Sequence, residues 1–238
     1  MKKSLLMAAL AAAVVGGALG DEEQAKDKPA SAVSPSDVSS NPDSIAMVFV
    51  KGGMLRTGTL RQRAVRSFYI ARYETTWELW HSVKGYNPSF KSERNLPVHG
   101  IDWTDVQEFI QELNAKTGKK YRLPTGAEWE YAARGGNKSK GYIFAGSNNI
   151  NKVAWYKENS GGNIHPVGTK KANELGIYDM TGNALELTDD ITYNRWLKGY
   201  RTFRGGCWRD DKRLCLISYR HIEVKLFEVL GFRLVLDP

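Results

Sequence analysis

The sequence has few of the residues that build disulfide-rich or bundle-like proteins. It holds only 2 Cys, 5 Met and 8 Pro among 238 residues, and two Cys are too few for a scaffold held by disulfides. Beyond the first 20 residues no apolar run approaches the roughly 20 residues that a membrane-spanning helix needs. The net charge of +8 is scattered, with no more than two basic residues in a row. We therefore expect no nucleic-acid partner.

Glycine and aromatic residues, in contrast, are plentiful. There are 23 Gly, 7 Trp and 11 Tyr, and 42% of the residues are hydrophobic. This composition is typical of a globular domain with many turns and aromatic packing. The length fits one domain with an appendage.

The N-terminal residues have the pattern of an export signal. Lys2 and Lys3 precede an apolar stretch that ends at Leu19, and Asp21 follows, which predicts a signal peptide over 1–20. Residues 21–43 are mostly Ser, Pro, Ala and charged residues and predict a disordered tether. The folded domain is then 44–238. We expect an exported protein of the cell surface or outer envelope.

The mode of attachment leaves two alternatives open. The apolar stretch could stay in the membrane as an N-terminal anchor, although it is short for a bilayer. A lipid anchor is the second alternative, but Asp21 stands where lipidation would require a Cys. Apart from such an anchor we expect no contact with a membrane.

Capping signals predict three helices, all in the first part of the domain. A Thr followed three residues later by Glu or Gln starts each one, and a Gly ends it. The predicted ranges are Thr75 to Gly85, Thr104 to Gly118, and Thr125 to Gly135. Short strands are expected at 46–50 and 67–72. After Gly136 the helical pattern disappears, so we predict an α+β domain with few helices and much irregular structure.

Several separated motifs carry a resemblance to a known family. They are MVFVKGG at 47–53, NLPVHGIDW at 95–103, YRLPTGAEWEYAARGG at 121–136, PVGTKKANELGIYDMTGNALELTDD at 166–190, FRGGCW at 203–208 and GFRLV at 231–235. Together they resemble the formylglycine-generating enzyme (sulfatase-modifying factor) family. The resemblance implies a C-type-lectin-like fold. It does not by itself imply the family's activity, because function lies in sites carried by a fold.

The catalytic branch of this family, as the resemblance implies, oxidises a substrate Cys with copper held by two Cys thiolates. Counted from the pair Gly205-Gly206, those positions hold Asp210 and Cys215. One thiolate lacks the second soft donor that Cu(I) favours, so we expect no copper and no catalysis. A disulfide or metal pair between Cys207 and Cys215 remains an alternative to two buried free thiols.

Two further features concern the middle motif. Where the catalytic branch has N-x-W-E-W, Leu185 and Leu187 replace both Trp. The family also often binds calcium at this turn. The resemblance implies a structural calcium site made of Asp179, Gly182, Ala184 and Glu186, with two carboxylates and two backbone carbonyls.

The segment after FRGGCW combines charged and apolar residues inside an otherwise regular frame. This resembles the variable proteins of diversity-generating retroelements, and implies a diversified ligand-binding segment over about 195–235. Its predicted contact residues are Arg209, Asp210, Asp211, Leu214, Leu216, His221, Ile222, Glu223, Val224, Leu226, Phe227 and Val229.

A buried strand is the alternative for part of this segment. Residues 221–226 alternate in the manner of a half-buried strand. The adjacent pairs 226–227 and 229–230 cannot both point inward on one strand, which favours a binding surface.

These observations predict a surface-displayed, non-catalytic protein that binds a ligand through its C-terminal segment. The expected partner is a protein or other macromolecule, for example on a host or neighbouring cell, and the expected state is a monomer. A copper-dependent formylglycine-generating oxidase and a periplasmic accessory or structural envelope protein are the alternatives.

Overall fold

The computed structural model describes residues 41–57, 61–85, 93–193, 198–222 and 227–238. The predicted signal peptide, most of the tether, and Glu223, Val224 and Leu226 lie outside these ranges. Within them, no helix is long and apolar enough to cross a membrane. Pro42–Ser44, which spans the predicted boundary between tether and domain, forms a short 3-10 helix, and Lys119 Nζ donates a hydrogen bond to the Asp43 carbonyl at 3.0 Å.

A four-stranded antiparallel sheet brings together strands from distant parts of the chain. Its order is β1-β4-β9-β5, with bounds Met47–Val50, Phe68–Ala71, Val235–Leu236 and Tyr121–Arg122. Val50, Phe68 and Ile70 are buried beneath it. Strand β9, formed late in the chain, thus pairs with two earlier strands.

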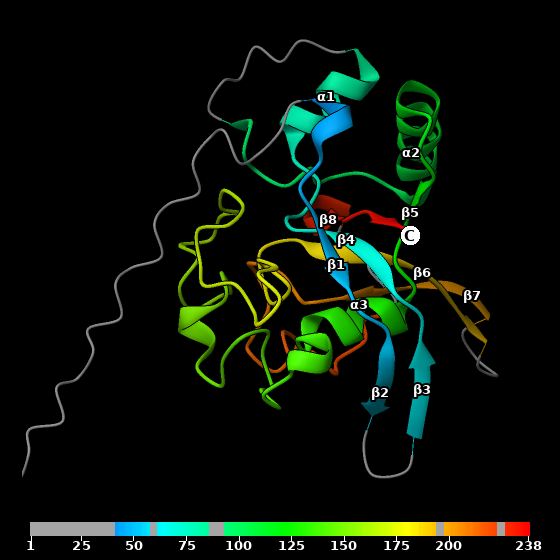
Figure 1. Ribbon diagram of the computed structural model, residues 1–238. Coiled ribbons are helices and arrows are strands. Elements are labelled where there is room, and N and C mark those ends of the chain that lie inside the picture. The colour runs from blue at the N-terminus through cyan, green and yellow to red at the C-terminus, as the bar shows by residue number, and fades with distance from the viewer. Residues whose placement is uncertain (1–40, 58–60, 86–92, 194–197, 223–226) are drawn as a thin grey trace, which may run out of the picture.

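Two smaller sheets complete the strand structure. A hairpin of β2 (Gly53–Thr57) and β3 (Arg61–Val65) projects from the domain on the side away from helices α1 (Trp77–Lys84) and α2 (Trp103–Thr117) (Figure 1). The second sheet has the order β7-β6-β8, with β6 at Leu185–Tyr193, β7 at Lys198–Arg204 and β8 at Leu230–Gly231. The β7 strand leads directly into the C-terminal segment.

The third predicted helix begins where the sequence indicated. Helix α3 spans Gly126–Ala133, and Thr125 and Glu128 form the predicted capping box. Gly135 follows in the left-handed region, with φ of 88°.

The first two helices begin at other residues than predicted. Helix α1 (Trp77–Lys84) is capped by Thr76 rather than Thr75, because the Thr75 N–H donates to the Phe232 carbonyl and its carbonyl accepts from the Val98 N–H, outside the helix. Helix α2 (Trp103–Thr117) is capped by Asp102, which forms a box with Asp105. That box replaces the one predicted at Thr104. Both helices end, as predicted, at a glycine in the left-handed region.

Short 3-10 turns and long loops make up most of the rest. The further 3-10 turns are η3 (Gly136–Lys138), η4 (Ile150–Lys152) and η5 (Phe227–Val229). Trp80 stacks on Phe109 at 4.8 Å between α1 and α2, with Phe232 against both rings. Trp129 of α3 anchors a second apolar cluster. The three helices, the small sheets and the extended loops confirm the predicted α+β class.

Candidate functional site

The position of the family's copper site holds two free, buried thiols and a carboxylate. Cys207 and Cys215 are not joined by a disulfide. Asp210 Oδ2 accepts a hydrogen bond from the Cys207 N–H at 2.9 Å, so this carboxylate closes a tight turn. Burial, followed by the charge of Asp210, raises the pKa of Cys207 to about 12, and the same two causes raise the pKa of Cys215. Both sulfurs are therefore protonated thiols at neutral pH.

This donor set does not fit copper bound by two thiolates. Copper(I) favours a pair of soft sulfur ligands, whereas Asp210 offers a hard oxygen that already serves the backbone. The two positions at which the catalytic branch has Trp also argue against catalysis, because here they hold Leu185 and Leu187, which are buried in the core. They cannot present the aromatic face that the resemblance implies for the catalytic branch.

The predicted calcium ligands lie around a buried arginine. Glu186 is fully buried, and its two oxygens accept from Arg233 at 2.5 and 2.6 Å, while Trp129 Nε1 donates to the same carboxylate at 2.7 Å. Arg233 also donates to the carbonyls of Ala71 and Tyr178. Burial lowers the pKa of Arg233, but the carboxylates of Glu186, Glu74 and Asp179 together raise it, and the net shift is upward. Glu186 is thus already neutralised by a cation.

The other predicted ligands surround the same centre. Asp179 Oδ2 accepts from the Gly168 N–H at 2.6 Å, and Oδ1 has no hydrogen-bond partner among the described residues. Burial raises the pKa of Asp179 to about 6. Glu74, whose carboxylate accepts from the amides of Asn183 and Ala184, also has a raised pKa because it is buried. No cluster of three metal-ligating side chains occurs in the described ranges.

These residues do not fit a calcium ion held through Glu186, because the Arg233 guanidinium occupies both of its oxygens. Gly182 and Ala184 contribute to the turn through their N–H groups, which donate to the Gly205 carbonyl and to Glu74. Calcium binding itself stays a prediction. A comparison of thermal unfolding in excess CaCl2 and in EDTA would test it.

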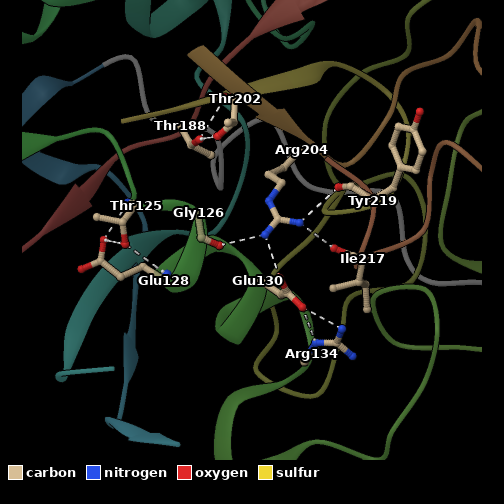
Figure 2. A network of polar contacts seen from close by, with 10 residues as sticks. All are labelled: Thr125, Gly126, Glu128, Glu130, Arg134, Thr188, Thr202, Arg204, Ile217 and Tyr219. Atoms are coloured by element: carbon tan, nitrogen blue, oxygen red, sulfur yellow. Dashed lines mark hydrogen bonds and ion pairs between the residues drawn. The ribbon is translucent and has the colours of Figure 1, made fainter. Parts of the chain in front are cut away.

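A second buried arginine fixes the start of the C-terminal segment. Arg204, at the end of β7, has no exposed surface and lies between α3 and the loop that follows (Figure 2). It donates to Glu130 at 2.7 Å and to the Gly126 carbonyl at 3.2 Å, both on α3. On the other side it donates to the carbonyls of Ile217 and Tyr219, each at 3.1 Å. Arg204 therefore holds the loop by its backbone.

Residues 209–222, called here the 209–222 segment, present mostly charged side chains to solvent. Its exposed members are Arg209, Asp211, Lys212, Arg213, Ser218, Tyr219 and Arg220. Two ion pairs reach outside the segment, from Arg209 to Glu228 at 2.9 Å and from Asp211 to Lys157 at 3.2 Å. Of the predicted contact residues, Arg209 and Asp211 are thus on the surface.

The remaining predicted contacts in the segment are half-buried. These are Asp210, Leu214, Leu216, His221 and Ile222. The His221 backbone pairs with Phe203 of β7 in an isolated antiparallel bridge, and its ring contacts the Leu214 carbonyl at 3.2 Å. Burial lowers the pKa of His221. These residues support the segment at least as much as they present a surface.

One predicted contact residue is wrong. Val229 is 3% exposed and belongs to the core cluster, as does Leu230. Both side chains of this adjacent pair are buried because the chain changes from the η5 turn to the β8 strand between them, so the rule for a single strand does not apply. The backbone of Phe227 begins η5, and Glu223, Val224 and Leu226 fall outside the described residues.

The sequence reasoning also missed residues that the fold brings together. Lys212, Arg213 and Tyr219 are exposed in the segment but were not selected. Ile143, from a loop about seventy residues earlier, accepts a backbone hydrogen bond from the Ile217 N–H at 3.1 Å. No local pattern in the sequence signals that pairing, because it depends on tertiary packing.

The fold and these residues are those of a known protein family. Residues 31–238 match the sulfatase-modifying factor enzyme 1-like domain, and the chain belongs to this family, as its motifs predicted. A relative named Chaperone protein LppX, from Paenibacillus barcinonensis, is 34% identical over 234 residues, covering 73% of this chain and 82% of that protein.

Other relatives relate the fold to different roles. A bovine protein (Bos taurus) named inactive C-alpha-formylglycine-generating enzyme 2 is 29% identical over 141 residues, which are 55% of this chain and 44% of that protein. Among solved structures, Treponema denticola variable protein 1 is similar with a TM-score of 0.69 and 25% identity, covering 81% of this chain and 94% of that one. The predicted likeness to the variable proteins is confirmed at the level of structure.

Proposed function

We propose that this protein is a non-catalytic binding protein of the cell envelope that contacts another macromolecule through the 209–222 segment. The observation that carries the proposal is the way the segment is held. The side chains of Cys215 and Ile217 are buried, and the backbone is held at the carbonyls of Ile217 and Tyr219 and at His221. The exposed side chains between them take little part in folding, which leaves them available to a partner.

The chemistry of the former copper position supports the non-catalytic part. The thiols of Cys207 and Cys215 are buried and protonated at neutral pH, and Asp210 stabilises a turn. The similarity to a protein named as inactive agrees with this proposal. Purified protein supplied with copper and a Cys-containing peptide should form no aldehyde. Aldehyde formation that requires Cys215 would overturn the non-catalytic assignment.

Diversification of the segment is the sharper part of the proposal. The DNA downstream of the gene should contain a near-copy of the codons for residues 195–238, differing mainly at adenines, next to a reverse transcriptase gene. The similarity in structure to a variable protein motivates this expectation. If no such copy exists, the segment is a fixed binding surface rather than a diversified one.

A second candidate role is assistance to one exported partner, and the similarity to a protein named as a chaperone favours it. The two roles differ in what the segment contacts. A chaperone-like protein would have one fixed client and an unvarying segment between strains. Sequencing the gene from several strains separates them, because diversification predicts differences confined to the exposed positions.

A further inference from the structure

A pocket lies where the 209–222 segment meets the loop 143–150. Its volume is about 430 Å³, within the range of roughly 300–1,000 Å³ that is usual for ligand sites. Four apolar residues line it: Ile143, Phe144, Ile150 and Leu216. Ile143 is 52% exposed, so the apolar lining continues onto the open surface.

The two walls of the pocket are joined by the backbone. The Ile217 N–H donates to the Ile143 carbonyl at 3.1 Å, and the Ile217 carbonyl accepts from Arg204. Within the loop, the Ile143 N–H donates to Asn148 Oδ1 at 3.0 Å. These hydrogen bonds connect the pocket to α3 through Arg204. The pocket is therefore formed without a ligand, which reduces the entropic cost of binding.

Lys212 and Arg213 give the pocket a positive edge. Both line it and both are exposed, and neither side chain forms an ion pair or hydrogen bond with another residue that the structure describes. The nearby carboxylates are already engaged, since Asp210 accepts from the Cys207 N–H and Asp211 pairs with Lys157. An apolar pocket with two unpaired cations at its edge is complementary to an apolar group flanked by negative charge.

We infer that this pocket receives an apolar side chain from an acidic peptide segment of the partner protein. The inference rests on the proposed function and adds the class of partner to it. Lys212 and Arg213 would contact carboxylates on either side of the bound residue, and Ile143 and Leu216 would contact the residue itself. An open site with two adjacent cations fits a peptide, whose charges are spread along the chain, better than a fatty acid, which has one carboxylate and a long tail to enclose.

Calorimetric titration of the full chain with synthetic peptides tests the inference. The probe is a six-residue peptide in which Leu-Phe is flanked on each side by two Asp or Glu, with blocked ends. Two matched peptides carry Ser-Ser in place of Leu-Phe, or Lys in place of every acidic residue. We expect the probe to bind at least tenfold more tightly than either matched peptide. Equal binding of all three, or no binding of the probe, overturns the inference.

Protein variants locate the binding. Lys212→Glu with Arg213→Glu should weaken the probe at least tenfold, and Ile143→Asp should weaken it similarly. The control is Arg56→Glu with Arg63→Glu, which makes the same charge change on exposed residues of β2 and β3. We expect less than a twofold effect there, because neither arginine lines the pocket and exposed charges that make no direct contact are weakened by salt. Equal losses of affinity for the probe in both double variants would mean that the peptide is attracted by the overall charge, and would overturn the assignment of binding to the pocket.

Competition with laurate separates the peptide from a lipid. If laurate displaces the probe peptide and binds more tightly than the peptide does, the pocket is a fatty-acid site and the peptide inference is overturned. Failure of these titrations leaves the proposed function open to its own tests, since neither the aldehyde assay nor the search for the DNA copy depends on Lys212 or Arg213. The two proposals can therefore fail separately.

Discussion

Arg233 and Arg204 are both fully buried, but their guanidinium charges are compensated in different ways. Arg233 faces Glu186 with two short hydrogen bonds, and its remaining donors reach carbonyls of the frame. Arg204 donates one hydrogen bond to Glu130, whose other oxygen accepts from Arg134. Its other hydrogen bonds are donated to backbone carbonyls of α3 and of the loop. Its Nε has no partner among the described residues, and burial lowers its pKa. The first arginine stabilises the frame, and the second attaches a loop to it.

The largest effect is expected at the frame. Arg233→Met leaves Glu186 buried beside Glu74 and Asp179 without its cation. We expect a loss of about 3–5 kcal/mol in the free energy of unfolding, measured by urea denaturation. The partly exposed pair of Arg94 and Glu78, whose side chains are 49% and 18% exposed, is the control, and Arg94→Met should cost about 1 kcal/mol or less. Similar losses in both variants would contradict the role given to Arg233.

Arg204→Met should cost less, about 1–3 kcal/mol, because Glu130 keeps its pair with Arg134. Its distinctive result is local. Hydrogen exchange should rise around residues 215–221 while the amides of β1 and β4 stay protected. A uniform rise over the whole domain would mean that Arg204 serves the frame rather than the loop.

The next comparison sets Val229 against Tyr219. Val229→Ala removes a core side chain that is 3% exposed and should cost about 2 kcal/mol. Tyr219→Ala truncates a side chain that is 39% exposed and should cost less than about 0.5 kcal/mol. Thermal unfolding of the two variants gives the answer. If Tyr219→Ala lowered the stability more than Val229→Ala did, the assignment of Tyr219 to the surface and of Val229 to the core would be wrong.

The smallest effect concerns the start of α3. Burial raises the pKa of Glu128, but hydrogen bonds from Arg122 and Thr125 lower it by more, so the folded-state pKa lies below the ordinary value of 4.5. The ionised carboxylate therefore stabilises the fold above that value, and its contribution is lost as the pH falls through the folded-state pKa. Glu128→Gln should cost about 1 kcal/mol at pH 7 and nothing in strong acid. A cost that stays constant with pH would contradict this assignment.

The fold was largely predictable because the family's motifs carry it, and the local caps explain both the correct and the incorrect helix starts. Thr125 caps α3 as predicted, and its side-chain hydrogen bonds are both with Glu128, the partner that the local pattern names. Thr75 does not cap α1 because two distant residues hold its backbone outside the helix: Phe232 accepts from its N–H, and the Val98 N–H donates to its carbonyl. Such a partner is invisible in a local pattern.

The candidate site was predictable only in part. Charge and position selected Arg209 and Asp211, which are exposed. The prediction that Val229 is a surface contact was wrong because the chain changes from a 3-10 turn to a strand beside it, whereas an argument from periodicity assumes one regular element. The loop at Ile143 could not have been assigned, because its contact with Ile217 exists only in the folded domain.

The position of β9 has a consequence for biosynthesis. This two-residue strand lies between β4 and β5, and Arg233, just before it, pairs with Glu186 and the Ala71 carbonyl. The four-stranded sheet therefore cannot be completed until residues 233–236 have been translated. Until then β1 and β4 can pair with each other, but β5 has no partner strand in this sheet. Closure of the sheet around β9 is therefore one of the last steps of synthesis, and a chain that lacks its final six residues could not make it.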